Sequence, residues 1–326
     1  MPNDWYIINI GQIGYYRVHY VDNNWELLID ELLKNYRSIP DSARPQIIGD
    51  LFHLANHGNV SFTTFLNLTK YLSQETQYVP WTTARRALLY LDRMLLLDEN
   101  YGGYQAYVRL LVNAAVRDVD WITMREDRNE EKHIPPGLRS VVYCTAIRFG
   151  GQAEWKFLRS QYNVNETEDV EKENILTGLS CSRDVWTMKL YFDWIKQDKQ
   201  YWSAIPEFAV SPIGNRMLWD HVHEAVKSLK TGMENSTRSP TDIDEFTKEV
   251  IQSLSNPYYS LNNRNDGEKI LRTEADWLQL PQNHTLKGEL KNLLTTSKRN
   301  LKWLDTHLQT IVQWLKENVP HTEQGV

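Results

Sequence analysis

The sequence predicts a mostly α-helical protein that begins with a short β-hairpin. The first twenty residues contain two runs of aromatic and β-branched side chains around a glycine-containing loop. From Asn23 onward, apolar residues recur at helical spacing, and no strand pattern separates the helical stretches. Of the 326 residues, 41% are hydrophobic and 11% are aromatic. This apolar content is sufficient for a core and excludes a wholly disordered chain.

The hairpin is expected to pair residues 5–10 with residues 15–20. Residues 11–14 between them read Gly-Gln-Ile-Gly, and the two glycines allow the positive φ angles that a tight loop requires. Because an isolated two-stranded hairpin is only marginally stable in water, these strands need a sheet that the rest of the chain does not supply. We therefore expect residues 1–21 to be the edge of another domain.

Residues 22–326 are expected to form a helical domain. Apolar stripes at residues 25–32 and 47–55 predict its first two helices, and Gly58 closes the second. Pro80 suits the first turn of a later helix, where a missing N–H costs nothing. The further helices are predicted after residue 60 and at residues 84–95, 104–116, 138–149, 154–162, 173–179, 185–195, 214–229, 243–254, 268–278 and 290–315, the last stripe being the longest.

Consecutive amphipathic helices with short connections predict paired helices that stack into a curved α-α superhelix. The sequence has no fixed repeat length, so any repeat is expected to be degenerate, as in HEAT or armadillo arrays. The mixed charged residues 125–132 interrupt the helical pattern and are predicted to be a loop. Such arrays bind partners along their concave face.

Charge and hydropathy exclude two classes of protein. The net charge of -6 and the pI of about 5.9 argue against binding to nucleic acid. The most apolar stretch, residues 87–97, contains Asp92 and Arg93 and is shorter than the roughly 18–20 residues needed to span a bilayer. Neither end carries a signal-peptide or anchor pattern, so any targeting signal or membrane anchor is expected outside this segment.

The cysteines and glycosylation sequons bear on the compartment. Cys144 and Cys181 are too few for a disulfide scaffold and lack the C-x-x-C spacing of a zinc or redox site, so the residues alone allow two free thiols or one bridge. About three N-x-[ST] sequons are expected by chance, and the excess favours a secreted chain. The five sequons begin at Asn59, Asn67, Asn165, Asn235 and Asn283.

Two histidine pairs are candidate metal ligands. His221, His223 and Glu224 resemble the start of a helical H-E-x-x-H zinc motif, but a cation, Lys227, occupies the position of the second ligand. His53 and His57 are four residues apart on a predicted helix but lack an adjacent general base and a third ligand. Ordinary helix residues are the simpler interpretation of both pairs. Phosphate-binding and hydrolase-elbow motifs do not occur.

A series of short motifs resembles the aminopeptidase N-like family of gluzincin zinc metallopeptidases. Residues 9–20, NIGQIGYYRVHY, are similar to its G-Y-Y-R-V-N-Y motif, and residues 44–55, RPQIIGDLFHLA, to its R-x-Q-I-I-x-D-x-F-x-L-A helix. The remaining matches follow in the family's order at residues 78–81 (YVPW), 138–144 (LRSVVYC), 179–181 (LSC), 219–220 (WD) and 300–303 (NLKW).

The resemblance implies a position at the end of a larger enzyme. Residues 1–21 would be the terminal strands of a β-sandwich domain, and residues 22–326 the HEAT/armadillo-like C-terminal domain that caps the active site. The family's H-E-x-x-H and G-A-M-E-N strings do not occur here, so no catalytic or metal residue is carried over. Zinc is implied for the full-length enzyme, with no cofactor in this chain.

Two local features follow from the resemblance. Cys144 and Cys181 match a cysteine pair that is bridged in extracellular members, so the resemblance implies a disulfide between them. Between Trp121 and Pro135 the family usually has roughly 40 more residues, including a helical pair. One turn of the superhelix is therefore expected to be missing.

The expected function is that of a cap on a cell-surface zinc exopeptidase, in which the chain encloses and positions peptide substrates and is inactive alone. Its expected partners are the catalytic and β-sandwich domains of the same polypeptide, at the extracellular face of the plasma membrane and anchored outside this segment. An alternative is a non-catalytic helical binding module or receptor surface, for example for bacterial toxins or pathogen ligands. A cytosolic scaffold would require free cysteines and unglycosylated sequons.

Overall fold

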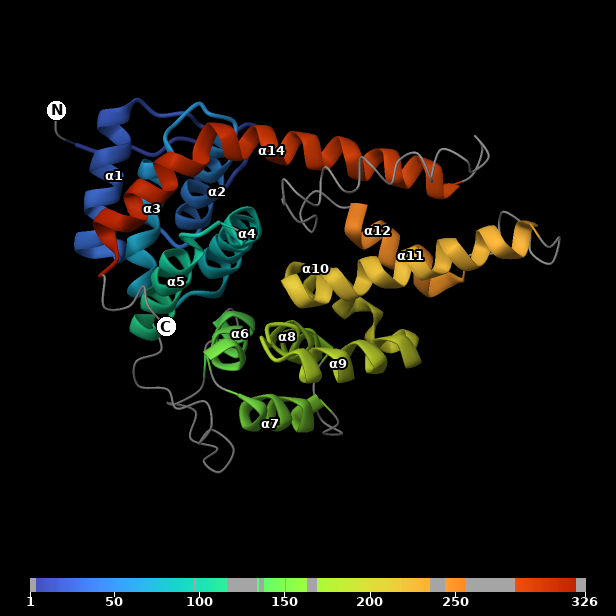
Figure 1. Cartoon of the computed structure of the whole chain (residues 1–326). Coiled ribbons are helices and arrows are strands. Elements are labelled where there is room, and N and C mark those ends of the chain that lie inside the picture. The colour runs from blue at the N-terminus through green and yellow to red at the C-terminus, as the bar shows by residue number, and fades with distance from the viewer. Residues whose placement is uncertain are drawn as a thin grey trace. The chain divides into compact units, whose positions relative to one another are not determined.

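A computed structural model describes residues 4–96, 98–115, 134, 138–149, 151–162, 169–234, 244–255 and 285–320. Over these ranges the chain is mostly helical, which confirms the predicted mostly-α class (Figure 1). The last helix is 34 residues long and is the longest of those described, as its apolar stripe predicts. The helix expected at 268–278 and the loop expected at 125–132 lie outside the described residues.

The chain divides into two compact units, Met1–Val141 with Thr306–Val326, and Val142–Asp305. The unit boundaries fall within α6 (Arg139–Phe149) and α14 (Thr285–Asn318). The first unit contains α1 (Asp22–Asn35), η1 (Tyr36–Ser38), α2 (Ala43–Asn56), α3 (Phe62–Thr69), η2 (Lys70–Ser73), α4 (Tyr78–Leu95) and α5 (Tyr101–Ala115). The second contains α7 (Gln152–Tyr162), α8 (Asp169–Leu179), α9 (Val185–Gln197), η6 (Lys199–Ala204), α10 (Ile205–Val210), α11 (Pro212–Glu234) and α12 (Glu245–Ser255).

The core of the first unit joins segments from both ends of the sequence. Helix α1 buries the predicted stripe that includes Trp25 and Leu32. Helix α3 lies beside α1, and α2 packs against α3 (Figure 1). Near the C-terminus, Trp314 of α14 donates a hydrogen bond from Nε1 to Asn67 Oδ1 of α3 at 2.8 Å. The Trp314 ring also packs edge-on against Tyr107 of α5, with ring centroids 5.0 Å apart. The last turns of α14 therefore complete this core.

In the second unit, helices α6, α7 and α8 approach one another closely at Gly178. A Cβ atom on Gly178 would lie 2.7 Å from both Leu158 Cδ2 of α7 and Tyr143 Cβ of α6, so a larger residue would force these helices apart. One residue beyond Tyr143, Cys144 forms a disulfide with Cys181, with Cα atoms 5.2 Å apart. The residues alone allow two free thiols or one bridge, and the structure contains the bridge.

The predicted N-terminal hairpin is wrong for this chain, because none of the described residues 4–21 forms a strand. Residues 4–10 do alternate between exposed and half-buried side chains, as in an extended chain. They do not pair with residues 15–20, because side chains of α1, α2 and Tyr20 satisfy their backbone groups instead. The loop between the two runs is closed by Asn9, whose side chain donates to Gly14 O at 2.9 Å and accepts from Gly14 N at 2.8 Å.

A buried ion pair fixes α2 against the connection between η2 and α4. Arg44 Nε lies 2.7 Å from Glu75 Oε2, and both side chains are almost completely removed from solvent. Arg44 also donates to Ile39 O at 2.8 Å. The second oxygen of Glu75 accepts hydrogen bonds from the backbone N–H groups of Thr76 and Gln77 at 3.0 and 2.9 Å. Both charges are therefore compensated by partners with good geometry.

Candidate functional site

The N-terminal segment, residues 4–21, lies against α1 and α2 through hydrogen bonds that replace a neighbouring strand. The amide of Asn24 accepts from Tyr6 N and donates to Tyr6 O, both at 3.0 Å. The N–H of Ile8 donates to the Tyr20 hydroxyl at 2.9 Å, and its carbonyl accepts from Gln46 Nε2 at 2.9 Å. One edge of the extended residues 6–8 is thus satisfied by side chains.

Asp50 of α2 holds the second half of this segment. Its Oδ2 accepts from Val18 N at 3.1 Å, and its Oδ1 lies 3.9 Å from Arg17 Nε. Burial raises the pKa of Asp50, although the Val18 N–H and the charge of Arg17 favour the ionised carboxylate. We call Asn24, Gln46 and Asp50 the anchor residues.

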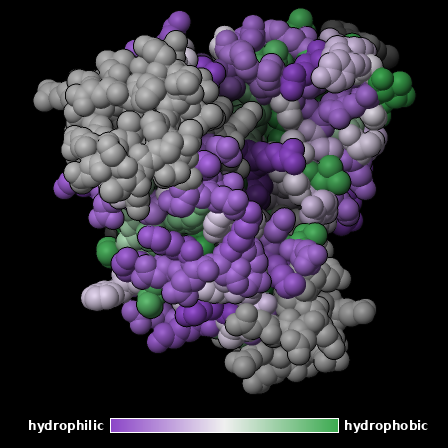
Figure 2. All heavy atoms as spheres, turned by 90° about the vertical axis from the view of Figure 1, so that its right-hand side faces the viewer, coloured by the Kyte–Doolittle hydropathy of each residue, from purple (hydrophilic) through white to green (hydrophobic). Residues whose placement is uncertain are grey.

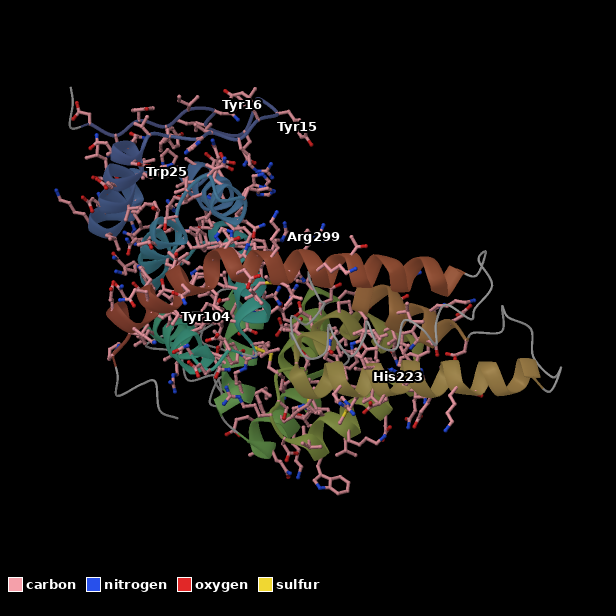
Figure 3. The ribbon with its side chains drawn as sticks, turned by 45° about the horizontal axis from the view of Figure 1, so that its top comes forward. Tyr15, Tyr16, Trp25, Tyr104, His223 and Arg299 are labelled. Carbon is pink, nitrogen blue, oxygen red and sulfur yellow. A yellow bond between two sulfur atoms is a disulfide. The ribbon has the colours of Figure 1, made fainter. Side chains whose placement is uncertain are left out.

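The opposite edge and one face of the N-terminal segment are available to a partner. In the part of the chain that the structure describes, Trp5 and Ile7 make no hydrogen bond. Tyr15 and Tyr16 directly follow the loop of the segment, whereas Trp25 lies on the side of α1 that faces the segment (Figure 3). The exposed large apolar side chains of the segment are Tyr6, Ile8, Ile10, Ile13, Tyr15, Tyr16 and Val21. This concentration of exposed apolar residues marks an interaction surface.

The histidines at 221 and 223 do not converge. His221 Nε2 lies 3.0 Å from Thr247 Oγ1, whereas Nδ1 of the exposed His223 lies 2.9 Å from the Trp219 carbonyl of its own helix, α11 (Figure 3). No group of three or more His, Cys, Asp or Glu side chains among the described residues is arranged to hold a metal ion. His53 and His57 do lie side by side, with ring centroids 4.1 Å apart.

Asp244 caps the N-terminus of α12 beside His221. Its carboxylate accepts from Thr247 N at 2.9 Å and from Thr247 Oγ1 at 2.7 Å. Partial burial raises the pKa of Asp244, but these hydrogen bonds and the proximity of His221 outweigh burial and lower it overall. The ionised form is therefore the one that stabilises α12.

Replacing Asp244 with alanine is expected to lower the free energy of unfolding by about 0.5–2 kcal/mol near neutral pH, as for other helix caps. Because the folded-state pKa of Asp244 lies below the unfolded value of about 3.9, its contribution is complete above that pH and is lost as the pH falls through the folded-state value. Urea titrations of both proteins between pH 7 and pH 3 should show the difference shrinking below about pH 4. A difference that stays constant to pH 3 would contradict this role.

Of the five predicted sequons, the structure describes two. Asn59 is exposed in the turn between α2 and α3, whereas Asn67 is half-buried within α3 and accepts the hydrogen bond from Trp314. Asn165, Asn235 and Asn283 lie outside the described residues.

Sequence reasoning missed the Arg44–Glu75 pair and the anchor residues. A signal existed for part of this set, because Gln46 and Asp50 fall at helical spacing among the apolar residues of α2, where a buried polar side chain needs a partner. Glu75 lies outside any pattern that distinguishes it from a solvated residue.

Sequence comparisons relate this chain to known proteins. The family model described as "ERAP1-like C-terminal domain" matches residues 5–133 and 123–274. The chain is 28% identical to aminopeptidase N of Rattus norvegicus and 27% identical to that of Homo sapiens, in each case over 97% of this chain and 36% of the relative. It is 25% identical to the thyrotropin-releasing hormone-degrading ectoenzyme of Rattus norvegicus over 97% of this chain and 33% of that protein.

The chain spans little more than a third of the length of these relatives. The match to the rat aminopeptidase N extends over 369 residues, whereas 97% of this chain is only about 316 residues, so the relative has residues that this chain lacks. No helix among the described residues is long and apolar enough to cross a membrane. The family match and the full-length alignments show that this chain belongs to the ERAP1-like C-terminal domain family, as a C-terminal domain of the aminopeptidase N-like type.

Proposed function

We propose that this chain is the non-catalytic cap of a cell-surface zinc aminopeptidase that removes N-terminal residues from peptides. Its helices would form a HEAT/armadillo-like chamber wall that limits and positions the substrate. The observation that carries this proposal is the N-terminal segment, which is fastened to the helices along one edge and leaves its other edge and its apolar side chains available. Such a surface suits attachment to a preceding domain of the same polypeptide, to which residues 1–21 would belong.

The geometry of the segment favours a strand as its partner. Backbone groups of residues 6 and 8 point toward the anchor residues, and in an extended chain those of residues 5 and 7 point the opposite way. An open edge of this kind accepts an added strand through main-chain hydrogen bonds. The large exposed side chains of Ile8 and Ile10 would then be covered by the same domain.

The described residues do not fit the zinc centre that the family implies, because no three ligand side chains come together in them. The zinc and the residues that use it would therefore belong to the rest of the longer polypeptide. This chain would contribute shape and closure, which sequester a substrate from water and restrict its size.

Location outside the cell is supported by two features of the chain and by one relative. A disulfide joins Cys144 and Cys181, and disulfides persist in oxidising compartments. The five sequons exceed the number expected by chance. One relative is named an ectoenzyme. The membrane anchor would lie outside this segment.

On this proposal, a glycan is expected on Asn59 but not on Asn67 in the folded protein. A sugar on Asn59 projects from an exposed turn, whereas a sugar on Asn67 would displace Trp314 and with it the end of α14. Glycopeptide mass spectrometry of the secreted chain, with and without enzymatic deglycosylation, measures occupancy at both positions. Stoichiometric modification of Asn67 together with an unchanged Trp314 environment would contradict this expectation.

A binding module or receptor surface is the second candidate, and α9 is the observation that favours it. Val185, Trp186 and Leu190 are exposed on this helix, Trp186 to 76%, and tryptophan is enriched at binding hot spots. Protein ligands such as toxins would be partners of this kind. On the face shown in Figure 2, however, hydrophobic residues are scattered among hydrophilic ones and do not merge into one patch.

The two candidates are separated by assaying the native polypeptide and the 326-residue chain on an aminoacyl anilide with added zinc. The cap proposal predicts that aminopeptidase activity co-purifies with the native polypeptide and is absent from the isolated chain. Hydrolysis by the isolated chain would refute the non-catalytic role. A native polypeptide without activity would favour the binding module.

A further inference from the structure

His53 and His57 form a close pair of imidazoles at the C-terminal end of α2. They are four residues apart, and their ring centroids are separated by 4.1 Å with an angle of 36° between the ring planes. The His53 side chain is half-buried and His57 is exposed, so solvent reaches the pair. Residues four apart on a helix share one face, which places both rings on the same side of α2.

The ring of His57 is held by a bond that leaves its outer nitrogen available. His57 Nδ1 lies 2.8 Å from the His53 carbonyl oxygen, and a carbonyl can only accept, so Nδ1 carries the proton and Nε2 the lone pair in the neutral ring. The main chain is fixed here too, because His57 N donates to His53 O and Gly58 adopts a positive φ of 75° that ends the helix. A hydrogen bond from Nδ1 to a carbonyl is the support that metal-binding histidines commonly have.

His53 supplies the second imidazole nitrogen that could bind a metal ion. Within the described residues its ring makes no hydrogen bond, and its only ring contact is with His57. The Arg17 guanidinium is paired with Asp50, at 3.9 Å, which reduces its repulsion of a cation.

We propose that His53 and His57 form a two-histidine site for a divalent transition-metal ion, with Cu²⁺ bound most tightly. Imidazole nitrogens suit Cu²⁺, Ni²⁺ and Zn²⁺, and affinity among these ions peaks at Cu²⁺. With metal–nitrogen bonds of ~2.0–2.1 Å, two imidazoles on one ion have centroids roughly 4.5–5.2 Å apart. The observed centroid distance of 4.1 Å is shorter than this range, so the exposed ring of His57 must turn away from His53 when both nitrogens bind one ion.

The site differs from a catalytic zinc centre and does not depend on the proposed cap function. No third His, Cys, Asp or Glu among the described residues joins the pair, so water would fill the remaining positions. A bound ion would link the last two turns of α2, the helix that also carries Gln46 and Asp50. Metal occupancy would therefore stabilise the helix to which the N-terminal segment is fastened.

The test is titration of the 326-residue chain with Cu²⁺, Ni²⁺ and Mg²⁺ by calorimetry, in parallel with His53→Ala and His57→Ala. His223→Ala is a matched control. His223 has the same contact from Nδ1 to the carbonyl four residues earlier, at 2.9 Å. The residues four positions before and after it are Trp219 and Lys227, so it has no second histidine on its helix face. The parent and the control should bind Cu²⁺ equally, and each pair variant at least tenfold more weakly. Mg²⁺ should not bind.

Electron paramagnetic resonance gives a second readout that does not depend on affinity. Nitrogen hyperfine structure from two imidazoles is expected in the Cu²⁺ complex of the parent chain, and from one in His53→Gln or His57→Gln, which keep side-chain polarity. Circular dichroism of each variant checks the fold. Unchanged Cu²⁺ affinity in either alanine variant, or no Cu²⁺ binding by the parent, would overturn the proposal.

Discussion

Replacing Arg44 with alanine is expected to lower the free energy of unfolding of the first unit by about 3–5 kcal/mol, the usual cost of leaving one charge of a buried ion pair without its partner. Glu75 would remain fully buried, with only the N–H groups of Thr76 and Gln77 and the Tyr71 hydroxyl to compensate its charge. The Ile39 carbonyl would also lose its hydrogen bond from the guanidinium. Urea denaturation followed by circular dichroism measures the change.

Two controls distinguish this effect from a general effect of losing an arginine. Arg216 pairs with Asp220 at 3.0 Å on an exposed face of α11, so Arg216→Ala should change the free energy of unfolding by less than about 1 kcal/mol. The double variant Arg44→Met with Glu75→Gln removes both charges and should recover much of the lost stability. A loss below 1 kcal/mol in Arg44→Ala would show that the buried pair does not hold α2 in place.

Removing the disulfide is expected to destabilise the second unit by about 4 kcal/mol. Cys144 and Cys181 are 37 residues apart. In the chain-entropy model, opening a loop of this length raises the entropy of the unfolded chain and so lowers its free energy by that amount. The variant Cys144→Ser with Cys181→Ser avoids an unpaired thiol. Its melting temperature and urea midpoint should both fall below those of the parent.

Chemical reduction provides the internal control for this prediction. Treating the parent with a reductant should reproduce the loss seen in the serine variant, while the same treatment should leave the variant unchanged. Two titratable thiols in the untreated native chain, or a parent whose stability is insensitive to reduction, would contradict the bridge.

The helices could be predicted from the sequence because burial imposes a 3.6-residue period on them. Trp25 and Leu32 mark the buried stripe of α1, and Pro80 lies in the first turn of α4, as predicted. The N-terminal segment shows the limit of this reasoning. Its runs of aromatic and β-branched residues favour strands, but they do not reveal whether the neighbour is a strand or, as with Asn24, a helix side chain.

The polar contacts could not be predicted because they join residues far apart in sequence. The ion pair of Arg44 with Glu75 spans 31 positions, and the contact of Trp314 with Asn67 spans 247. Neither pair follows a repeating sequence pattern, and each contact depends on the packing of several helices. Cys144 and Cys181 were paired from resemblance alone, since two cysteines in a chain are compatible with either redox state.

The motifs that carry the family resemblance have a physical explanation in this structure. In the motif at residues 44–55, Gln46 donates to the Ile8 carbonyl and Asp50 accepts from the Val18 N–H. Arg17, from the motif at residues 9–20, lies beside Asp50. The two motifs therefore act on each other across the boundary between the N-terminal segment and the helices. This contact is the feature on which attachment to a preceding domain would depend.

The mass of the native polypeptide that carries this chain decides whether the chain is the cap of a larger aminopeptidase. An antibody raised against the 326-residue chain would isolate that polypeptide for mass measurement after reduction and deglycosylation. We expect a mass of about 100 kDa, since the chain spans only 36% of the length of aminopeptidase N from rat and human. A mass near 38.3 kDa, that of this chain alone, would contradict it and identify a free-standing module.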